Sequence, residues 1–334
     1  MKIIIDAMSG DKAPEEIVKG AVMARRELGV DVVLVGQQEV VKACLEAESC
    51  TDIEVVDARD VITMEDDPST ATRRKKDASM TVALNMLRDG SGDAVVSAGS
   101  TGALLTGATL IVKRINGIRR AALAPVLPNG DKGVVLIDSG ANVDCTPEYL
   151  LQFAYMGSFY ARTMLGLENP RVGLANVGTE DTKGGVLQHE TFQLLKAAGE
   201  AGRINFIGNV EGNGVFSGDV DVLVADGFTG NLMLKTAESM IKFMMGNLKS
   251  VFYKNLKNKL AAAVLKGDLA QMKKMLDVKE VGGTVMLGIS RPVIKAHGSS
   301  DARCILAAAR QAVTCVNSGI TEEIKANIEY MKIG

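Results

Sequence analysis

The sequence is poor in the residues that build metal sites and disulfide frameworks. Its 334 residues include two histidines and five cysteines, and the cysteines show no C-x-x-C spacing. An odd number of scattered cysteines with so few histidines excludes both a familiar zinc site and a disulfide scaffold. Unpaired cysteines are typical of a reducing compartment, so we expect a cytoplasmic protein.

Proline and net charge are also low. Seven prolines and no low-complexity stretch leave no obvious linker, so we expect a single α/β domain over residues 1–334. The formal net charge of −2 offers no general basic field for a phosphate backbone, which argues against a nucleic-acid partner. With 47% hydrophobic and 23% charged residues, a chain of this length can bury most of the surface that it exposes when unfolded, so disorder is excluded.

Long apolar segments are missing as well. Three isoleucines separate Lys2 from Asp6, which is too short a run for a secretory signal. Residues 94–112 carry no charge over nineteen positions and approach the length of a membrane span, but eight of the nineteen are Gly, Ser or Thr. A buried strand, a tight loop and a helix explain this segment better.

Signatures of nucleotide binding and of serine catalysis are missing too. The chain contains neither G-x-G-x-x-G nor G-x-x-x-x-G-K-[ST], so a nucleotide is not the expected ligand. It also lacks a G-x-S-x-G nucleophile elbow, and only His189 and His297 could serve a Ser–His–Asp triad. Covalent acyl transfer through serine is therefore disfavoured.

What the chain does have is a series of short apolar runs separated by helical stretches. Runs that are apolar on both faces and alternate with helices predict a mostly parallel sheet with helices on both faces. The expected strands are residues 2–6, 31–36, 53–57, 94–97, 133–138, 171–176, 205–208 and 221–225.

Several of these runs end in glycine next to a small polar residue. In an open α/β sheet the ligand crevice lies beyond the carboxyl ends of the strands, so these loops should line it. Glycine lets a ligand approach backbone N–H groups, and a following helix N-terminus favours an anion such as phosphate. Taken singly, each loop could also be an ordinary turn in which glycine serves only the backbone conformation. The loops are VVSAGSTG, VVLIDSGAN, GLANVGTE, NFIGNVEGNG and VLVADGFTGN.

Residues 237–277 form a helical excursion with its own charge. Apolar residues recur every three or four positions from Ala237 to Leu260, which predicts one face of a long helix. A break at Lys266-Gly-Asp268 precedes a second helical pattern over residues 269–276. Between residues 241 and 277 there are eight lysines and two aspartates. We expect a protruding helical hairpin that is basic on a slightly acidic molecule.

Read in order, the loops resemble the phosphate acyltransferase family (acyl-ACP:phosphate acyltransferase, PlsX) of bacterial phospholipid synthesis. The matching stretches follow one another along nearly the whole chain, and the longest, over residues 218–235, is specific by itself. They are IDAMSGDKAP (5–14), RRKKDASM (73–80), SAGSTGA (97–103), IDSGAN (137–142), TEDTKGG (179–185), FIGNVEG (206–212), GDVDVLVADGFTGNLMLK (218–235) and HGSS (297–300).

The resemblance implies transfer of a fatty acyl group from acyl carrier protein to inorganic phosphate, giving acyl phosphate for glycerol-3-phosphate acylation. It also implies a homodimer and a fold similar to the isocitrate and isopropylmalate dehydrogenases and to phosphotransacetylase. The chain departs from the family pattern at a few positions. Ser9 and Lys12 stand where Gly and His are usual, Ser100 replaces a common Asn, and Ser139 replaces a small apolar residue.

A thioester is already activated, so attack by phosphate needs no protein nucleophile, cofactor or metal. The site must instead hold two anionic groups together with cations and N–H donors. We expect Lys183, in a Gly-flanked loop, to bind phosphate, although a solvated surface lysine is the alternative. Asn231 could face the ligand or cap a helix, and His297 could protonate the departing thiolate or be structural. The expected phosphate-binding residues are Ser100, Thr101, Gly102, Asn142 and Asn176.

Two surfaces are candidates for larger partners. The hairpin tip, with Leu260, Val264 and Leu265 between lysines, suits an anionic membrane surface, and a dimer interface along the apolar stripe is an equal alternative. Acyl carrier protein is acidic, so its docking surface should be basic. The run Arg73, Arg74, Lys75 and Lys76 is our candidate, with Arg119-Arg120 and the hairpin as alternatives.

Two other classes of function compete with this interpretation. A dehydrogenase of the related fold would need a nicotinamide site and usually metal-binding carboxylates. A non-enzymatic membrane adaptor would leave the five glycine-rich strand ends unexplained.

Overall fold

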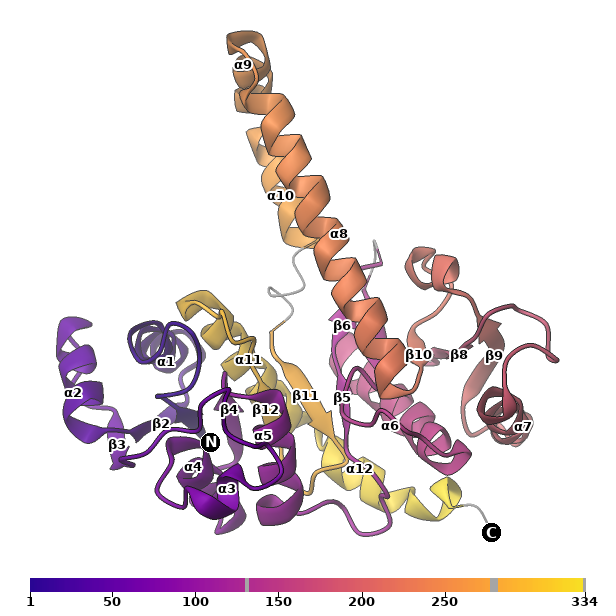
Figure 1. Ribbon diagram of the computed structural model, residues 1–334, viewed down its shortest axis with the longest axis horizontal. Helices are drawn as coiled ribbons and strands as arrows, with labels where there is room; N and C mark the ends of the chain where they lie inside the picture. The colour runs from indigo at the N-terminus through magenta and orange to yellow at the C-terminus, as the bar shows by residue number, and fades with distance from the viewer. Residues whose placement is uncertain (130–131, 277–281, 333–334) are drawn as a thin grey trace.

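The computed structural model describes residues 1–129, 132–276 and 282–332, and it confirms the α/β class with mostly parallel strands (Figure 1). The strands form two sheets. The first has the order β3-β2-β1-β4-β12-β11-β5 and the second the order β6-β7-β10-β8-β9. The first sheet contains β1 (Lys2–Asp6), β2 (Asp31–Gly36), β3 (Glu54–Asp57), β4 (Ala94–Ser97), β5 (Ala122–Ala124), β11 (Thr284–Leu287) and β12 (Val293–Lys295). The second contains β6 (Val126–Leu127), β7 (Val134–Ile137), β8 (Arg171–Ala175), β9 (Asn205–Val210) and β10 (Val222–Val224).

All eight predicted strands are present, and their ends agree to within two residues. The four strands that the sequence did not predict, β5, β6, β11 and β12, are two to four residues long. Pairs β5–β11, β11–β12 and β6–β7 are antiparallel. Runs this short carry no periodicity that could separate a strand from a loop.

The helices cover the sheets on both faces. Alternate residues of β1 enter different cores: Ile3 and Ile5 join the cluster that includes α1 and α11, whereas Ile4 joins the cluster that includes α4. This division follows from the two-residue period of a strand. The helices of the body are α1 (Glu15–Leu28), α2 (Gln38–Ala47), α3 (Ala71–Arg74), α4 (Ser79–Arg88), α5 (Thr101–Gly107), α6 (Pro147–Leu165), α7 (Val186–Glu200), α11 (Ala302–Ser318) and α12 (Ile320–Ala326), with short turns η1 (Ala108–Val112), η2 (Gly212–Phe216) and η3 (Ile328–Met331).

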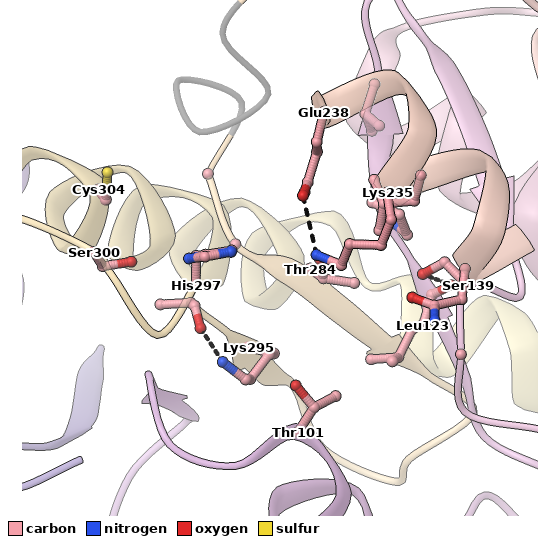
Figure 2. Close-up of a pocket in the computed structure, with 18 residues that line it drawn as sticks. Thr101, Leu123, Ser139, Lys235, Glu238, Thr284, Lys295, His297, Ser300 and Cys304 are labelled. Carbon is pink, nitrogen blue, oxygen red and sulfur yellow. Dashed lines mark hydrogen bonds and ion pairs between the residues drawn. The ribbon is translucent and has the colours of Figure 1, made fainter. Parts of the chain in front are cut away.

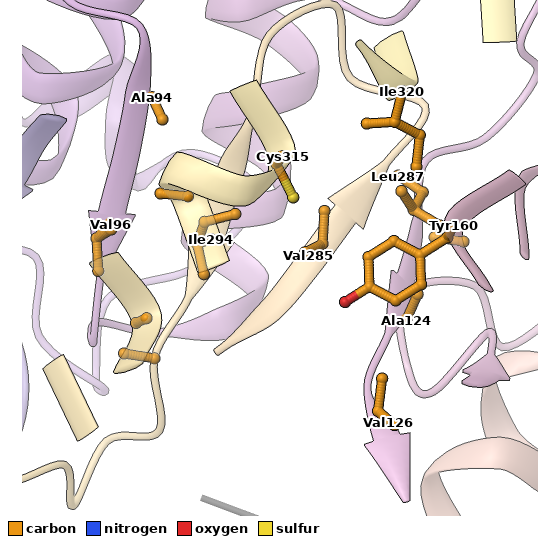
Figure 3. Packing of buried hydrophobic residues seen from close by; sticks show 14 of the residues in the cluster. Ala94, Val96, Ala124, Val126, Tyr160, Val285, Leu287, Ile294, Cys315 and Ile320 are labelled. Carbon is orange, nitrogen blue, oxygen red and sulfur yellow. The ribbon is translucent and has the colours of Figure 1, made fainter. Parts of the chain in front are cut away.

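The two sheets join at Pro125. Strand β5 ends at Ala124 and β6 begins at Val126, so the chain leaves the first sheet and enters the second across this one residue. Proline has no N–H to continue the ladder, but its carbonyl accepts from the Leu136 N–H at 3.0 Å. One hydrophobic core then runs between the sheets, where Tyr160 of α6 lies near Leu287 and Ala124 (Figure 3).

The expected hairpin projects from the body (Figure 1). Helix α8 (Gly227–Tyr253) leads outward, α9 (Leu256–Val264) forms the far end, and α10 (Lys266–Leu276) returns. Asp277, the last residue of the predicted excursion, lies outside the described residues.

Two details of the predicted hairpin are wrong. The long helix is interrupted after Tyr253, because the Asn255 side chain accepts from the Asn258 N–H at 2.9 Å and starts a new helix. Leu256 and Leu260 therefore belong to α9. The predicted break at residues 266–268 is instead the first turn of α10. Glycine costs a helix only about 1 kcal/mol relative to alanine, which is not enough by itself to end one.

The uncharged segment 94–112 folds as β4, α5 and η1, as predicted. Within the described ranges, every helix is too short or too polar to cross a membrane.

Candidate active site

A cavity of about 330 Å³ lies where the end of β12, the loop after β7 and the start of α8 meet (Figure 2). One wall is apolar, with Leu123, Pro125, Val126 and Leu234. The polar groups that line the cavity are Thr101, Ser139, Asn231, Lys235, Glu238, Thr284, Lys295, His297 and Ser300. Such a mixture of apolar wall and converging polar groups is typical of a small-molecule site.

The loop after β4 brings one predicted phosphate-binding residue to the cavity. Thr101 begins α5 and lines the cavity, but its two neighbours have other functions. The Ser100 hydroxyl accepts from the Ala103 N–H at 3.5 Å and so caps α5. Gly102 faces Pro68, which leaves no room there for a side chain. Neither Ser100 nor Gly102 lines this cavity, and their role in binding phosphate stays a prediction.

The beginning of α8 brings Asn231 to the cavity. Asp226 caps this helix, since its carboxylate accepts from the Thr229 N–H at 2.9 Å and from the Thr229 hydroxyl at 2.7 Å. Asn231 is therefore free of the capping role that was its alternative. It lies beside Gly140 and shares one helix face with Lys235 and Glu238, since residues three, four and seven positions apart lie on the same side.

Two charged residues of that face form an ion pair. Lys235 Nζ lies 3.0 Å from Glu238 Oε2, and both side chains line the cavity. Lys235 was part of the matching stretch 218–235, but nothing in the sequence distinguished it from the other lysines.

Lys295, at the end of β12, is a cavity residue that the sequence analysis missed. It is only 9% exposed, and its Nζ donates to the carbonyl of Ala98 at 3.3 Å and to that of Ala296. Burial lowers the pKa of Lys295 to about 8, with Lys235 acting in the same direction and Asp6 and Asp11 opposing it. The signal was a lysine directly after the apolar run Val293-Ile294, a position that becomes buried only once β12 is known.

His297 follows in the loop after β12 and also lines the cavity. Its Nδ1 lies 2.9 Å from the Ser299 hydroxyl and accepts from the Ser299 N–H at 3.1 Å. A nitrogen that accepts from the backbone carries no proton, so in the neutral ring the proton is on Nε2. Nearby, the Ser300 hydroxyl is buried and has no hydrogen-bond partner in the described part of the chain.

Asn142 does not line this cavity, and its role in binding phosphate stays a prediction. The side-chain NH2 group of Asn142 donates to the Ala121 carbonyl at 2.8 Å and to Asp138 Oδ2 at 3.0 Å. The backbone carbonyl of Asn142 accepts from the Gly227 N–H. These bonds fix the loop after β7 against the start of α8. Burial raises the pKa of Asp138, while its several N–H partners lower it. Asn142 therefore orders this loop through its side-chain NH2 group and its backbone carbonyl.

Lys183 and Asn176 lie together in the loop after β8 and not in the cavity. Asn176 Nδ2 donates to the Lys183 carbonyl at 3.0 Å. The Lys183 side chain is 47% exposed, and its Nζ lies 3.7 Å from Glu180 Oε1. Within one chain, the structure does not bring these two predicted residues to Thr101, Asn231 and His297.

The predicted basic run also differs from expectation at one position. Arg73, Arg74 and Lys76 are exposed, but Lys75 is not free to meet a partner. Its Nζ lies 2.8 Å from Asp66 Oδ2 and donates to the Val61 carbonyl at 2.8 Å. Lys75 thus fastens its own loop.

The carboxylates of the predicted loops have ordering roles. Asp6 accepts from the Ser97 hydroxyl at 2.6 Å, and Asp138 and Asp226 hold the loops described above. Among the residues that the structure describes, no cluster of histidine, cysteine or acidic side chains could hold a metal ion.

Solved structures with a similar fold include phosphotransacetylases. EutD phosphotransacetylase from Staphylococcus aureus superimposes with a TM-score of 0.61 at 15% sequence identity, covering 95% of this chain and 94% of the other. A 4-hydroxythreonine-4-phosphate dehydrogenase from Burkholderia phymatum gives a TM-score of 0.51 at 14% identity, covering 94% of this chain and 97% of the other. At these identities the likeness concerns the fold alone.

The sequence comparisons identify the family. The profile of a family described as fatty acid synthesis protein matches residues 1–323. Phosphate acyltransferase from Oceanobacillus iheyensis is 45% identical over 330 residues, which cover 98% of each chain. Phosphate acyltransferase from Geobacillus thermodenitrificans is 46% identical over 331 residues, covering 98% of this chain and 99% of the relative. The chain therefore belongs to the phosphate acyltransferase family and transfers acyl groups to phosphate.

Proposed function

We propose that the acyl donor is a fatty acyl thioester of acyl carrier protein, and that the acyl phosphate formed serves glycerol-3-phosphate acylation in phospholipid synthesis. The observation that carries this proposal is the cavity itself. It combines two lysines and several hydrogen-bond donors with an apolar wall, as phosphate beside a long-chain thioester requires.

The proposed reaction needs no covalent enzyme intermediate. A phosphate oxygen attacks the thioester carbonyl, a C–O bond forms, and the C–S bond breaks. The proton that phosphate loses ends on the thiol of the carrier. We propose that Asn231 and Thr101 donate to the oxyanion that develops on the carbonyl, and that the His297 Nε2–H donates a hydrogen bond to the departing thiolate, which takes up the proton that phosphate releases. Each such donor is worth about 2 to 4 kcal/mol of barrier.

Docking of acyl carrier protein is proposed on the exposed residues Arg73, Arg74 and Lys76. They lie on or just after α3, which packs against α5, whose first residue Thr101 lines the cavity. A carrier bound there would deliver its thioester from the α5 side. Contacts of this kind chiefly raise the association rate and weaken as salt rises.

The test of this function is incubation with palmitoyl-acyl carrier protein and inorganic phosphate, followed by trapping with hydroxylamine. We expect phosphate-dependent palmitoyl hydroxamate together with one equivalent of free carrier thiol. Palmitoyl-CoA in place of the carrier substrate tests the donor, and it should be the poorer substrate at equal concentration. Thiol release without hydroxamate would indicate thioester hydrolysis and would contradict the proposal.

We further propose that the hairpin tip contacts an anionic membrane surface and that the outer face of α8 pairs two chains. At the tip, Leu260 is 61% and Val264 85% exposed, and Lys257, Lys259 and Lys266 surround them. Exposed lysines beside exposed apolar side chains suit the headgroup region of a bilayer. Closer to the body, α8 exposes Met240 and Phe243, which a second copy would cover.

The double variant Leu260→Glu with Val264→Glu separates these two contacts. Two carboxylates at the tip should be repelled by anionic lipid, so we expect at least about a tenfold loss of binding to phosphatidylglycerol vesicles in sedimentation. The variant should remain a dimer in sedimentation equilibrium, because Met240 and Phe243 are unchanged. Vesicle binding equal to that of wild type would show that the tip does not contact the membrane.

A further inference from the structure

Among the residues that the structure describes, Lys295 is a buried cation with no acidic partner in contact. In the described part of the chain its Nζ donates only to the carbonyls of Ala98 and Ala296. Asp6 and Asp11 act on Lys295 only through longer-range electrostatics, and neither forms an ion pair with it in the described residues. A buried ammonium is costly, and a chain that only needed to join these carbonyls could use a neutral donor.

The surroundings of Lys295 indicate what is missing. An ammonium has three N–H donors, and two are directed to the carbonyls, so the third remains for a ligand. Figure 2 shows the Lys295 and Lys235 side chains reaching into the same cavity from β12 and from α8. Their mutual repulsion is one reason for the lowered pKa of Lys295. An anion between the two ammonium groups would relieve that repulsion.

We propose that Lys295 anchors the inorganic phosphate in this cavity and that Lys235, held by Glu238 until then, is the second cation that contacts it. This inference rests on the proposed function, because it names the residue that binds the acceptor phosphate. It differs from the expectation for Lys183, which lies outside the cavity.

Binding of phosphate by Lys295 should weaken as the pH rises. The groups that face Lys295 are Asp6 and Asp11 from the strand β1 region, Lys235 and Glu238 from α8, and His297 from its own loop. Only the protonated form attracts phosphate, so its contribution is present well below about pH 8 and disappears as pH rises above that value. Bound phosphate stabilises the charged ammonium group, so the pKa of Lys295 is higher in the complex than in the free protein.

The first test is Lys295→Met, which keeps an unbranched side chain up to the position of Cε and removes the charged amino group. We expect the KM for phosphate to rise about 100-fold, since a buried charge-assisted contact is lost. Calorimetric titration with inorganic phosphate should show a matching loss of affinity. Lys235→Met should raise the KM about tenfold, because that side chain is half exposed. The control is Lys325→Met, a surface lysine of α12 paired with Glu322, which should change nothing. A Lys295→Met KM within threefold of wild type overturns the inference.

The second test uses the wild-type protein and so does not depend on how a variant folds. Sulfate remains a dianion across the range used, so any change in its affinity reports on the protein. We expect its dissociation constant, measured by calorimetry, to rise about tenfold for each pH unit above about pH 8. Equal affinities at about pH 7 and about pH 9.5 would contradict the assignment. If wild-type protein binds sulfate in this way but forms no acyl phosphate, the proposed function fails and the anion site stands.

Discussion

Gly230→Ala is expected to destabilise the protein by about 3 kcal/mol and to lower acyl-phosphate formation about 100-fold. A Cβ on Gly230 would overlap the carbonyl oxygen of Asp138, which belongs to the backbone and cannot rotate away. The start of α8 would therefore have to move from the loop after β7. Asn231 is the next residue, so this movement would also displace it from the cavity.

Gly246→Ala on the same helix is the matched control. A Cβ at this position meets nothing within 4 Å, and alanine favours a helix by about 1 kcal/mol over glycine. We expect stability equal to wild type or higher and unchanged turnover. Urea unfolding and the hydroxamate assay check both variants. Normal stability and turnover in Gly230→Ala would contradict the close approach of α8 and the loop.

Lys183→Ala is expected to abolish acyl-phosphate formation while the protein stays folded, as the family resemblance implies, although Lys183 is not among the residues that line the cavity. This expectation comes from the family resemblance and from the Gly-flanked loop that holds the residue. The side chain is half exposed and its pair with Glu180 is at the surface, so the free energy of unfolding should change by less than about 0.5 kcal/mol.

Lys196→Ala is a demanding control for Lys183. Lys196, on α7, is 49% exposed and its Nζ lies 3.5 Å from Asp181 of the loop that holds Lys183, so the variant removes the same charge from beside that loop. The turnover of Lys196→Ala should equal that of the wild-type protein. A Lys183→Ala enzyme that keeps more than half of wild-type turnover would exclude Lys183 from the mechanism and leave Lys235 and Lys295 as the cations of the site.

The buried parallel strands were predictable because each is an apolar run of sufficient length. In β1, for example, residues 3, 4 and 5 are all isoleucine, because both faces of the strand pack against hydrophobic cores. The division into two sheets was not predictable. It depends on Pro125 and on strands such as β6, with two residues, whose pairing is decided by partners far along the chain.

The site was predictable only in part. Thr101 and Asn231 were chosen from glycine-rich loops after predicted strands, and His297 was chosen as one of two histidines, in the stretch HGSS; all three line the cavity. Ser100 and Asn142 have the same residue types in similar loops, yet their polar groups are used by the helix cap of α5 and by the loop after β7. Local sequence does not reveal whether a side chain is satisfied by its neighbours or left for a ligand.

The amino-acid sequence by itself determined the α/β class, the helical hairpin with its basic charge, and the glycine-rich strand ends, because these follow from periodicity and composition within short windows. Only the tertiary structure decided which polar groups face the cavity and how buried Lys295 is. The reason is that desolvation and hydrogen-bond partners arise when β12, α8 and the loop after β7 meet, and these segments are distant in the chain.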